Sequence, residues 1–202
     1  MRTLAVVLTL ATTPAGAGNL AYIDQAGIGH WARQTQTGVN EATILQAGSG
    51  HWAEQNQSGS NVGLIDQTGH RQLAAMDQTG TNAARIAQAG SGNRAALMQD
   101  GAANQATVSQ SGTNNKSVVT QSGSGNVSST TQRGVNNTSE HIQDGDRNEV
   151  TTIQEGRSTL SITQSGTNNT FDSRLYDGSQ GFRIQQSGNG MDLRVTQTPA
   201  QR

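Results

Sequence analysis

The sequence lacks most of what an ordinary globular core is built from. Its 202 residues include no cysteine, two prolines, only 3% aromatic residues and only 31% hydrophobic residues. Without cysteine, no disulfide can hold a fold together. Charged residues make up 13% of the chain and nearly cancel to a net charge of -1, so the high net charge typical of disordered chains is also missing. The chain therefore offers no charge-based reason to expect a nucleic-acid partner, and its order must come from something other than a large core.

Amide side chains and glycine are what the chain has in excess. Glutamine occurs 23 times, asparagine 16 times and glycine 25 times, together 64 of the 202 positions. This bias is typical of segments that associate through β-structure rather than of catalytic domains. A net charge near zero removes the repulsion that would keep copies apart.

The N-terminus has the features of an export signal. Arg2 supplies a short positive region, an apolar stretch covers residues 3–11, and small residues at 15–17 form a cleavage site. The segment is too short to remain as a membrane-spanning helix, and no later run approaches the roughly 20 apolar residues that a span needs. We expect a secretory signal peptide at residues 1–17 and a mature, extracytoplasmic chain at residues 18–202.

One repeat fills the expected mature chain. Its anchor is a glutamine that recurs at a nearly constant spacing, first from Gln25 to Gln36, with Tyr176 at the one place where a glutamine is missing. A glycine follows two positions after sixteen of the seventeen anchors. The anchors are Gln25, Gln36, Gln46, Gln57, Gln67, Gln78, Gln88, Gln99, Gln110, Gln121, Gln132, Gln143, Gln154, Gln164, Tyr176, Gln186 and Gln197.

Three further columns precede the anchor at steps of two residues, which is the side-chain alternation of a strand. Two before the anchor the residue is mostly large and apolar, as at Ile44; four before, it is mostly small, as at Ala42; six before, it is mostly Asn, as at Asn40. The intervening residues are mostly polar and are expected to face solvent. Each unit therefore predicts one strand and one glycine-assisted turn.

A longer period joins the units in pairs. His30-Trp31-Ala32 recurs as His51-Trp52-Ala53, so the full repeat consists of two consecutive units. The pattern predicts an all-β, amyloid-like parallel β-solenoid of about 17 strand-turn units in two facing sheets, with two units per rung and rungs about 4.8 Å apart. Because facing strands run in opposite directions, the small column should meet the large apolar one across the core.

Identical amides stacked on successive rungs can pass hydrogen bonds along a column, whereas one isolated buried amide would cost about 1–3 kcal/mol. We therefore expect two kinds of ladder and one column of turns. The ladder residues are Gln25, Gln46, Gln67, Gln88, Gln110, Gln132 and Gln154, with Asn19, Asn40, Asn61, Asn82 and Asn104, and the turn residues are Gly27, Gly48, Gly69, Gly90 and Gly112.

The repeat begins at Asn19 and continues to Gln197 without the polar capping units that keep a solenoid monomeric. Exposed strand edges template further strands. We expect a fibre in which the junction between copies imitates an internal rung.

The motif Asn-x-Ala-x-Ile-x-Gln-x-Gly at residues 19–27, 40–48 and 82–90 resembles the curlin repeats of bacterial curli fibres. This resemblance covers residues 19–197. It implies a secreted subunit of an extracellular functional amyloid on the outer cell surface, serving adhesion and biofilm matrix. Its partners would be copies of itself, other curlin subunits and the curli secretion and assembly machinery.

Two subunit roles remain open within this resemblance. The first unit, residues 19–27, and the closing Gln197 are similar to the minor, nucleating curlin, which we favour, although seventeen units would also suit the major subunit. The major curlin has a non-repeat leader after its signal peptide, and none is expected here. Outside the family, a monomeric solenoid that binds ice or polysaccharide is disfavoured because its outward column is not uniform, as Tyr22, Arg33 and Glu54 show.

The repeat leaves no room for the loops of an active site, so we expect no enzyme, no catalytic residue, no cofactor and no metal site. His30 and His51 share a column but are interpreted as a stacked polar turn rather than as metal ligands. Trp31 and Trp52 are interpreted as a surface aromatic stack.

Two local features near the C-terminus carry expectations of their own. Arg183 and Arg194 are expected to share an outward column, with Arg202 beyond, either as a surface contact or as charges that limit lateral association. Taking Tyr176 as an anchor would turn Asp172 and Arg174 inward. We therefore predict a slip or bulge that buries Phe171, Ser173 and Leu175 instead.

Overall fold

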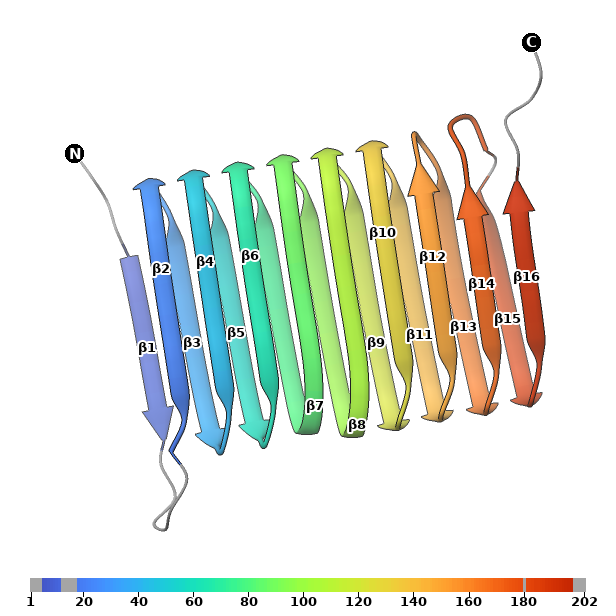
Figure 1. Cartoon of the computed structure of the whole chain (residues 1–202), viewed down its shortest axis with the longest axis horizontal. Coiled ribbons are helices and arrows are strands. Elements are labelled where there is room, and N and C mark those ends of the chain that lie inside the picture. Colours follow the sequence, from blue (N-terminus) through green and yellow to red (C-terminus); the bar gives the residue numbers. More distant parts are fainter. Residues whose placement is uncertain (1–4, 12–17, 180, 198–202) are drawn as a thin grey trace.

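The computed structural model describes residues 5–11, 18–179 and 181–197, and side chains from residue 18 onward. The described chain is an all-β parallel β-solenoid of about eight turns (Figure 1). No helix occurs in these ranges, and hence none that could cross a membrane. The expected cleavage site at residues 15–17 and Arg202 lie outside the described residues.

The strands are mostly six to nine residues long, and two of them continue around a turn. They are β1 (Ala5–Ala11), β2 (Leu20–Ile28), β3 (Trp31–Gly38), β4 (Glu41–Ser49), β5 (Trp52–Gly59), β6 (Val62–His70), β7 (Leu73–Ser91), β8 (Arg94–Thr113), β9 (Lys116–Ser124), β10 (Val127–Val135), β11 (Thr138–Asp146), β12 (Glu149–Glu155), β13 (Thr159–Thr167), β14 (Thr170–Leu175), β15 (Phe182–Asn189) and β16 (Asp192–Gln197).

Each strand pairs in parallel with the strand one turn away, which produces two series of paired strands. Starting at β2, one series continues through β4 and β6 to β10, β12, β14 and β16; the other runs from β1 through β3 and β5 to β9, β11, β13 and β15. Figure 1 shows the first series in front of the second. The sequence predicts two separate sheets, but the strands connect as one 16-stranded sheet because β7 and β8 contribute to both series.

Like residues pair with like along both series. Ile44 pairs with Ile23 on one side and Ile65 on the other, while Trp31 pairs with Trp52. Between β7 and β8 the separation of paired residues grows by one position across an irregularity between Thr81 and Ala83. The extra residue is therefore absorbed in a turn, and the strands keep their phase.

Alternate residues of each strand point inward and form the core. Its first cluster combines the small and the large apolar columns, as predicted, from Ala32 to Val119. A second cluster contains Val150, Leu160, Ile162, Phe171 and Leu175. Between the two clusters the inward positions are polar, and this stretch is described below.

The predicted slip at the weakest unit is present. Strand β14 pairs with β12 so that Leu175, not Tyr176, lies beside Gln154, and Phe171 lies beside Val150. Phe171, Ser173 and Leu175 are buried, whereas Tyr176 leaves the strand. Burying two apolar side chains instead of Asp172 and Arg174 explains the shift, since an unpaired charge in the core is costly.

Glycine after each anchor is required by the turn. Gly90 has a φ of 109° and Gly112 a φ of 111°, a region that side chains with a Cβ rarely adopt. A Cβ at Gly90 would also collide with the carbonyl oxygen of Gly112 on the next rung. Of the predicted turn residues, Gly27, Gly48 and Gly69 have the same positive φ and the same close approach.

Candidate assembly surface: amide ladders and open ends

The predicted glutamines of the first series form a continuous hydrogen-bonded column. The amide Nε2 of each residue donates to Oε1 of the next, from Gln25 to Gln46 at 2.6 Å and onward to Gln154 at 2.8 to 2.9 Å. From Gln46 onward, the second N–H of each amide donates to a backbone carbonyl of the other series, as from Gln88 to Leu73 O at 3.1 Å. Both hydrogens of these buried amides are thereby used.

The second series carries an equivalent column. Donation runs from Gln36 to Gln57 at 3.1 Å and continues through Gln78, Gln99, Gln121, Gln143 and Gln164 to Gln186. In both columns the donor belongs to the earlier rung and the acceptor to the later rung. The glutamine columns therefore have a direction along the long axis.

The asparagine column runs in the opposite direction. Asn40 donates from its backbone N and its Nδ2 to Oδ1 of Asn19 at 2.9 and 3.2 Å, so here the later rung is the donor. Asn61, Asn82 and Asn104 repeat this arrangement. Further along the chain, Asn169 donates to Asn148 in the same sense, and its own Oδ1 accepts from Met191 N at 3.1 Å.

Because the glutamine and asparagine columns donate in opposite directions, particular side-chain atoms lack a hydrogen-bond partner at each end of the solenoid. At the N-terminal end, the Oε1 atoms of Gln25 and Gln36 are buried and accept no hydrogen bond, because no earlier rung supplies an amide. At the C-terminal end, Leu175 interrupts the first column. Gln154 Nε2 keeps its bond to the other series, to Thr138 O at 2.9 Å, and donates to Ser158 O at 3.3 Å where a glutamine acceptor is missing. Gln197 Oε1 is left without a partner.

Both ends also leave core residues half covered. On β2, the inward side chains of Ala21, Ile23 and Gln25 are only partly buried, although their counterparts one turn later on β4 are fully buried. Phe182 and Ile184 on β15, with Val195 on β16, pack against the second core cluster but remain partly exposed. The two ends are thus incomplete rungs rather than capped ones.

The two histidines and two tryptophans form stacks on adjacent rungs. The rings of His30 and His51 are 4.9 Å apart and buried, and each Nε2 lies within hydrogen-bond distance of a turn carbonyl. Burial lowers the pKa of His51 from its usual value. Trp31 and Trp52 stack at 4.8 Å on the half-exposed face. Within the described residues, no cluster of His, Asp or Glu has the makings of a metal site.

The arginines predicted to share an outward column lie in different series. Arg183 is on β15 beside Ser161, while Arg194 is on β16 and contacts Asp172 at 3.2 Å. Consecutive units alternate between the series, so equivalent positions in neighbouring units face opposite ways. The expectation of one shared column is therefore wrong.

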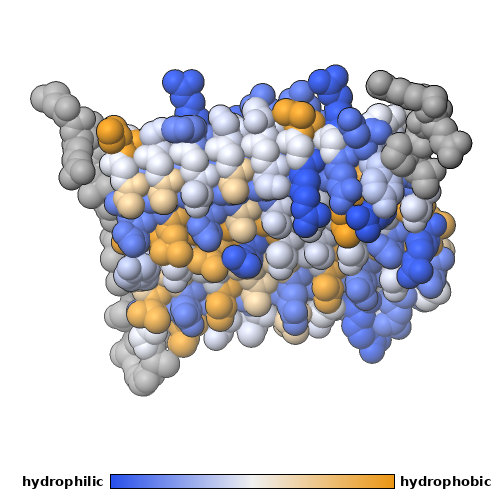
Figure 2. Space-filling model, turned by 45° about the horizontal axis from the view of Figure 1, so that its top comes forward, coloured by the Kyte–Doolittle hydropathy of each residue, from blue (hydrophilic) through white to orange (hydrophobic). Residues whose placement is uncertain are grey.

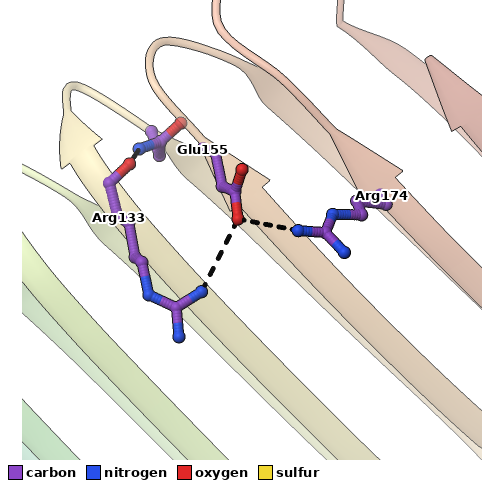
Figure 3. A network of polar contacts seen from close by, with 4 residues as sticks. Arg133, Glu155 and Arg174 are labelled. Carbon is purple, nitrogen blue, oxygen red and sulfur yellow. Dashed lines mark hydrogen bonds and ion pairs between the residues drawn. The ribbon is translucent and has the colours of Figure 1, made fainter. Parts of the chain in front are cut away.

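Outward charges in the C-terminal half form pairs along the rungs. Glu155 accepts from Arg174 at 3.1 Å and lies 3.7 Å from Arg133, so one carboxylate bridges three successive strands (Figure 3). In the N-terminal half the same face carries Leu20, Tyr22 and Val62, each more than half exposed. Figure 2 shows the corresponding gradient, with hydrophobic residues gathered toward the N-terminal side.

Sequence reasoning missed a buried histidine between the two core clusters. His141 is fully buried, and its ring nitrogens lie 2.8 to 3.4 Å from the hydroxyls of Ser128, Thr130, Ser139 and Thr152. Burial lowers the pKa of His141 to about 3. The signal was present as three successive polar residues, Thr130, His141 and Thr152, in the large apolar column.

A second feature that sequence reasoning missed is a pair of buried core amides. Gln34 and Gln55 lie on adjacent rungs in the column that is apolar in most other units. Gln34 Nε2 donates to Tyr22 O at 3.1 Å, but neither side-chain atom of Gln55 has a partner. Gly63 makes room for them, since a Cβ there would meet the Gln55 amide.

These features define the class: a repeat β-solenoid with uncapped ends and directional amide ladders. A family model, the curlin associated repeat, matches residues 101–129. The residue columns of this matched stretch continue on both sides of it, so the repeat of this chain is similar to the curlin repeat. Comparison with curated proteins and with solved structures found no match.

Proposed function

We propose that the chain is the secreted subunit of an extracellular curli-type fibre that grows by stacking copies end to end. One observation carries the proposal: Gln25 and Gln36 each bury an acceptor at the N-terminal end that nothing in the described chain satisfies. A junction between copies would bury both acceptors, and a donor from the second copy would satisfy each of them; left unpaired there, each would cost about 1–3 kcal/mol.

The direction of hydrogen-bond donation in the glutamine columns determines which end of one copy can stack on which end of the next. Gln186 and Gln197 are the last glutamines of the two columns, and a donor from an earlier rung is what Gln25 and Gln36 lack. Strands β15 and β16 of one copy would pair with β2 and β3 of the next, respectively, once residues 1–17 are removed. A reversed copy would place acceptor against acceptor, so growth should be head to tail.

Similarity to the curlin repeat supports the finer parts of the proposal. Curlin subunits form extracellular fibres for adhesion and biofilm matrix, so we place this chain on the outer cell surface and assign its export to the curli secretion machinery. Within the fibre we favour the nucleating role over the bulk role. Arg183 and Arg194 remain proposed surface contacts, each on the face of its own series, with Arg202 beyond.

A charge at the junction tests the proposal directly. Ile23 is inward and half covered on β2, so Ile23→Lys is tolerated in the single copy but would bury a charge in the junction. We expect seeded elongation by this variant to fall at least tenfold. Leu20→Lys on the same strand is the matched control, because Leu20 points outward and is 60% exposed.

Equal elongation of Ile23→Lys and the unaltered chain would place the junction elsewhere and refute the proposal. The subunit role is tested separately by cross-seeding. A nucleator should shorten the lag of a major curlin at a low molar ratio, whereas a chain that polymerises only with itself would favour the bulk role.

A further inference from the structure

Strand β1 occupies one of the edges that the proposed junction needs. Residues Ala5–Ala11 pair in parallel with β3, from Ala5 beside Trp31 to Ala11 beside Thr37. The pairing continues the phase of the repeat, with Leu10 in register with Gln36. This is the position in which β16 of a second copy would bring Gln197 to Gln36.

The segment fills the backbone edge but not the ladder. Leu10 has no side-chain donor, and Gln36 Oε1 is without a partner while β1 is in place. The neighbouring edge of β2 is not covered, since β2 pairs only with β4 among the described strands. An incoming copy would therefore find one of the two strand edges taken.

The tether strengthens this competition. A segment joined by a short linker acts at an effective concentration in the mM range, whereas a second copy arrives at its own concentration in solution. For equal intrinsic pairing, β1 would outcompete a subunit present at about 1 μM by a factor of about 10³. The competition ends when hydrolysis, with water added across the peptide bond after residue 17, separates β1 from the chain.

We infer that residues 5–11 act as an intramolecular cap on the β3 edge, and that β16 of a second copy replaces them after cleavage. This inference rests on the proposed function, since it assumes the end-to-end junction. It adds that the uncleaved chain is held in a form that elongates poorly.

The test compares four forms of the chain in one seeded elongation assay. They are the full chain, the full chain cut after residue 17 by a site-specific protease, and the full-length variants Val7→Pro and Val7→Thr. Proline removes a backbone donor from the middle of β1 and prevents pairing, whereas threonine is favourable in strands and serves as the control. Far-UV circular dichroism verifies that the solenoid is retained.

The cut chain and Val7→Pro should elongate at least tenfold faster than the full chain and Val7→Thr. Equal rates for the full and the cut chain would overturn the cap while leaving the junction intact. A cut chain that elongates quickly beside a slow Val7→Pro would also overturn it, because strand pairing would not be the block. If even the cut chain fails to elongate on seeds, the proposed function itself fails.

Discussion

The N-terminal and C-terminal halves of the solenoid share one backbone but differ in what fills it. From β2 to β9 the core contains one apolar cluster of alternating small and large residues, from Ala32 to Val119, interrupted by the buried amides of Gln34 and Gln55. At β10 and β11 the core becomes polar around His141, and only from Val150 onward is it apolar again. On the outward face of the first series, exposed Leu20, Tyr22 and Val62 lie toward the N-terminus, and the ion pairs of Glu155 and Asp172 lie toward the C-terminus.

The amide ladders do not follow this division. Across the polar layer, Gln121 donates to Gln143 at 2.8 Å and Gln110 to Gln132 at 2.8 Å, as in the apolar half. Strand register is equally continuous through β9, β11 and β13. The amide ladders and the backbone pairing therefore maintain the fold locally even where the core is not apolar.

Acid should distinguish the two halves most strongly. The pKa of His141 is about 3 in the folded chain and near 6.5 when unfolded, so the unfolded chain binds the extra proton first as the pH falls. His141 therefore contributes full stability above pH 6.5 and loses about 1.4 kcal/mol per pH unit down to about pH 3. We expect amide exchange in β10–β12 to accelerate before exchange in β4–β6.

The variant His141→Val is the control for this prediction. Valine matches the neighbours Val119 and Ile162 in the same column and has no proton to bind. The difference in pH dependence between the variant and the unaltered chain should amount to about 5 kcal/mol across that range. Identical acid transitions for both chains would show that His141 does not control them.

Breaking a ladder in the apolar half should be the next largest effect. Gln88→Leu leaves Gln67 Nε2 without its acceptor and Gln110 Oε1 without its donor, both buried. We expect unfolding to become easier by about 1–3 kcal/mol for each group left unpaired, measured by denaturant titration. In the triple variant with Gln88, Gln110 and Gln132 all changed to Leu, fibre elongation should also slow, and unchanged kinetics would argue against the ladder.

Leu175→Gln is the reverse substitution, made in the C-terminal half of the solenoid. A glutamine there could accept from Gln154 and donate to Gln197 Oε1, which has no partner, while some apolar packing is lost. The change in stability should therefore be smaller than that of Gln88→Leu. A loss as large as that of Gln88→Leu would mean that packing, not the ladder, dominates at this rung.

A smaller effect, this time a gain in stability, is expected when the buried amide without a hydrogen-bond partner is removed from the N-terminal half. Gln55→Met removes a buried amide that has no partner and places methionine beside Met76. The variant should gain about 1–2 kcal/mol in thermal or denaturant unfolding, since the desolvation cost disappears. A destabilised variant would indicate that the amide has a partner, such as a buried water.

The smallest effect should come from the outward charges. Glu155→Gln removes both ion pairs to Arg133 and Arg174, which are partly exposed to solvent. The loss should be about 0.2–1 kcal/mol and should shrink as salt is added. A salt-independent loss above this range would show that Glu155 acts through something other than charge.

Much of this architecture is predictable from the sequence because one physical rule repeats. Period-two alternation predicts the strands, and a recurring Gln-x-Gly predicts the anchor and turn, as at Gln88 and Gly90. The slip at Leu175 is also predictable, since charges avoid the core. The continuity of β7 and β8 around their turns could not be predicted, because it depends on turn geometry. At Ala103, for example, φ is 56°, a value that an alanine in the sequence does not predict. The partners of His141 lie mostly on other strands, so they become visible only once the units are paired.

The extra residue lies on β8 between Ala102 and Gln105, opposite Thr81 and Ala83 of β7, and its absorption in the turn has a consequence for how such molecules can change in length. The backbone pairing keeps its register on both sides of the rung whose turn holds the additional residue. Gene duplication or deletion of a whole pair of strands would therefore leave the backbone pairing of the remaining rungs in register. Nothing in this pairing fixes the number of rungs, so the solenoid can lengthen or shorten while the two ends keep their shape.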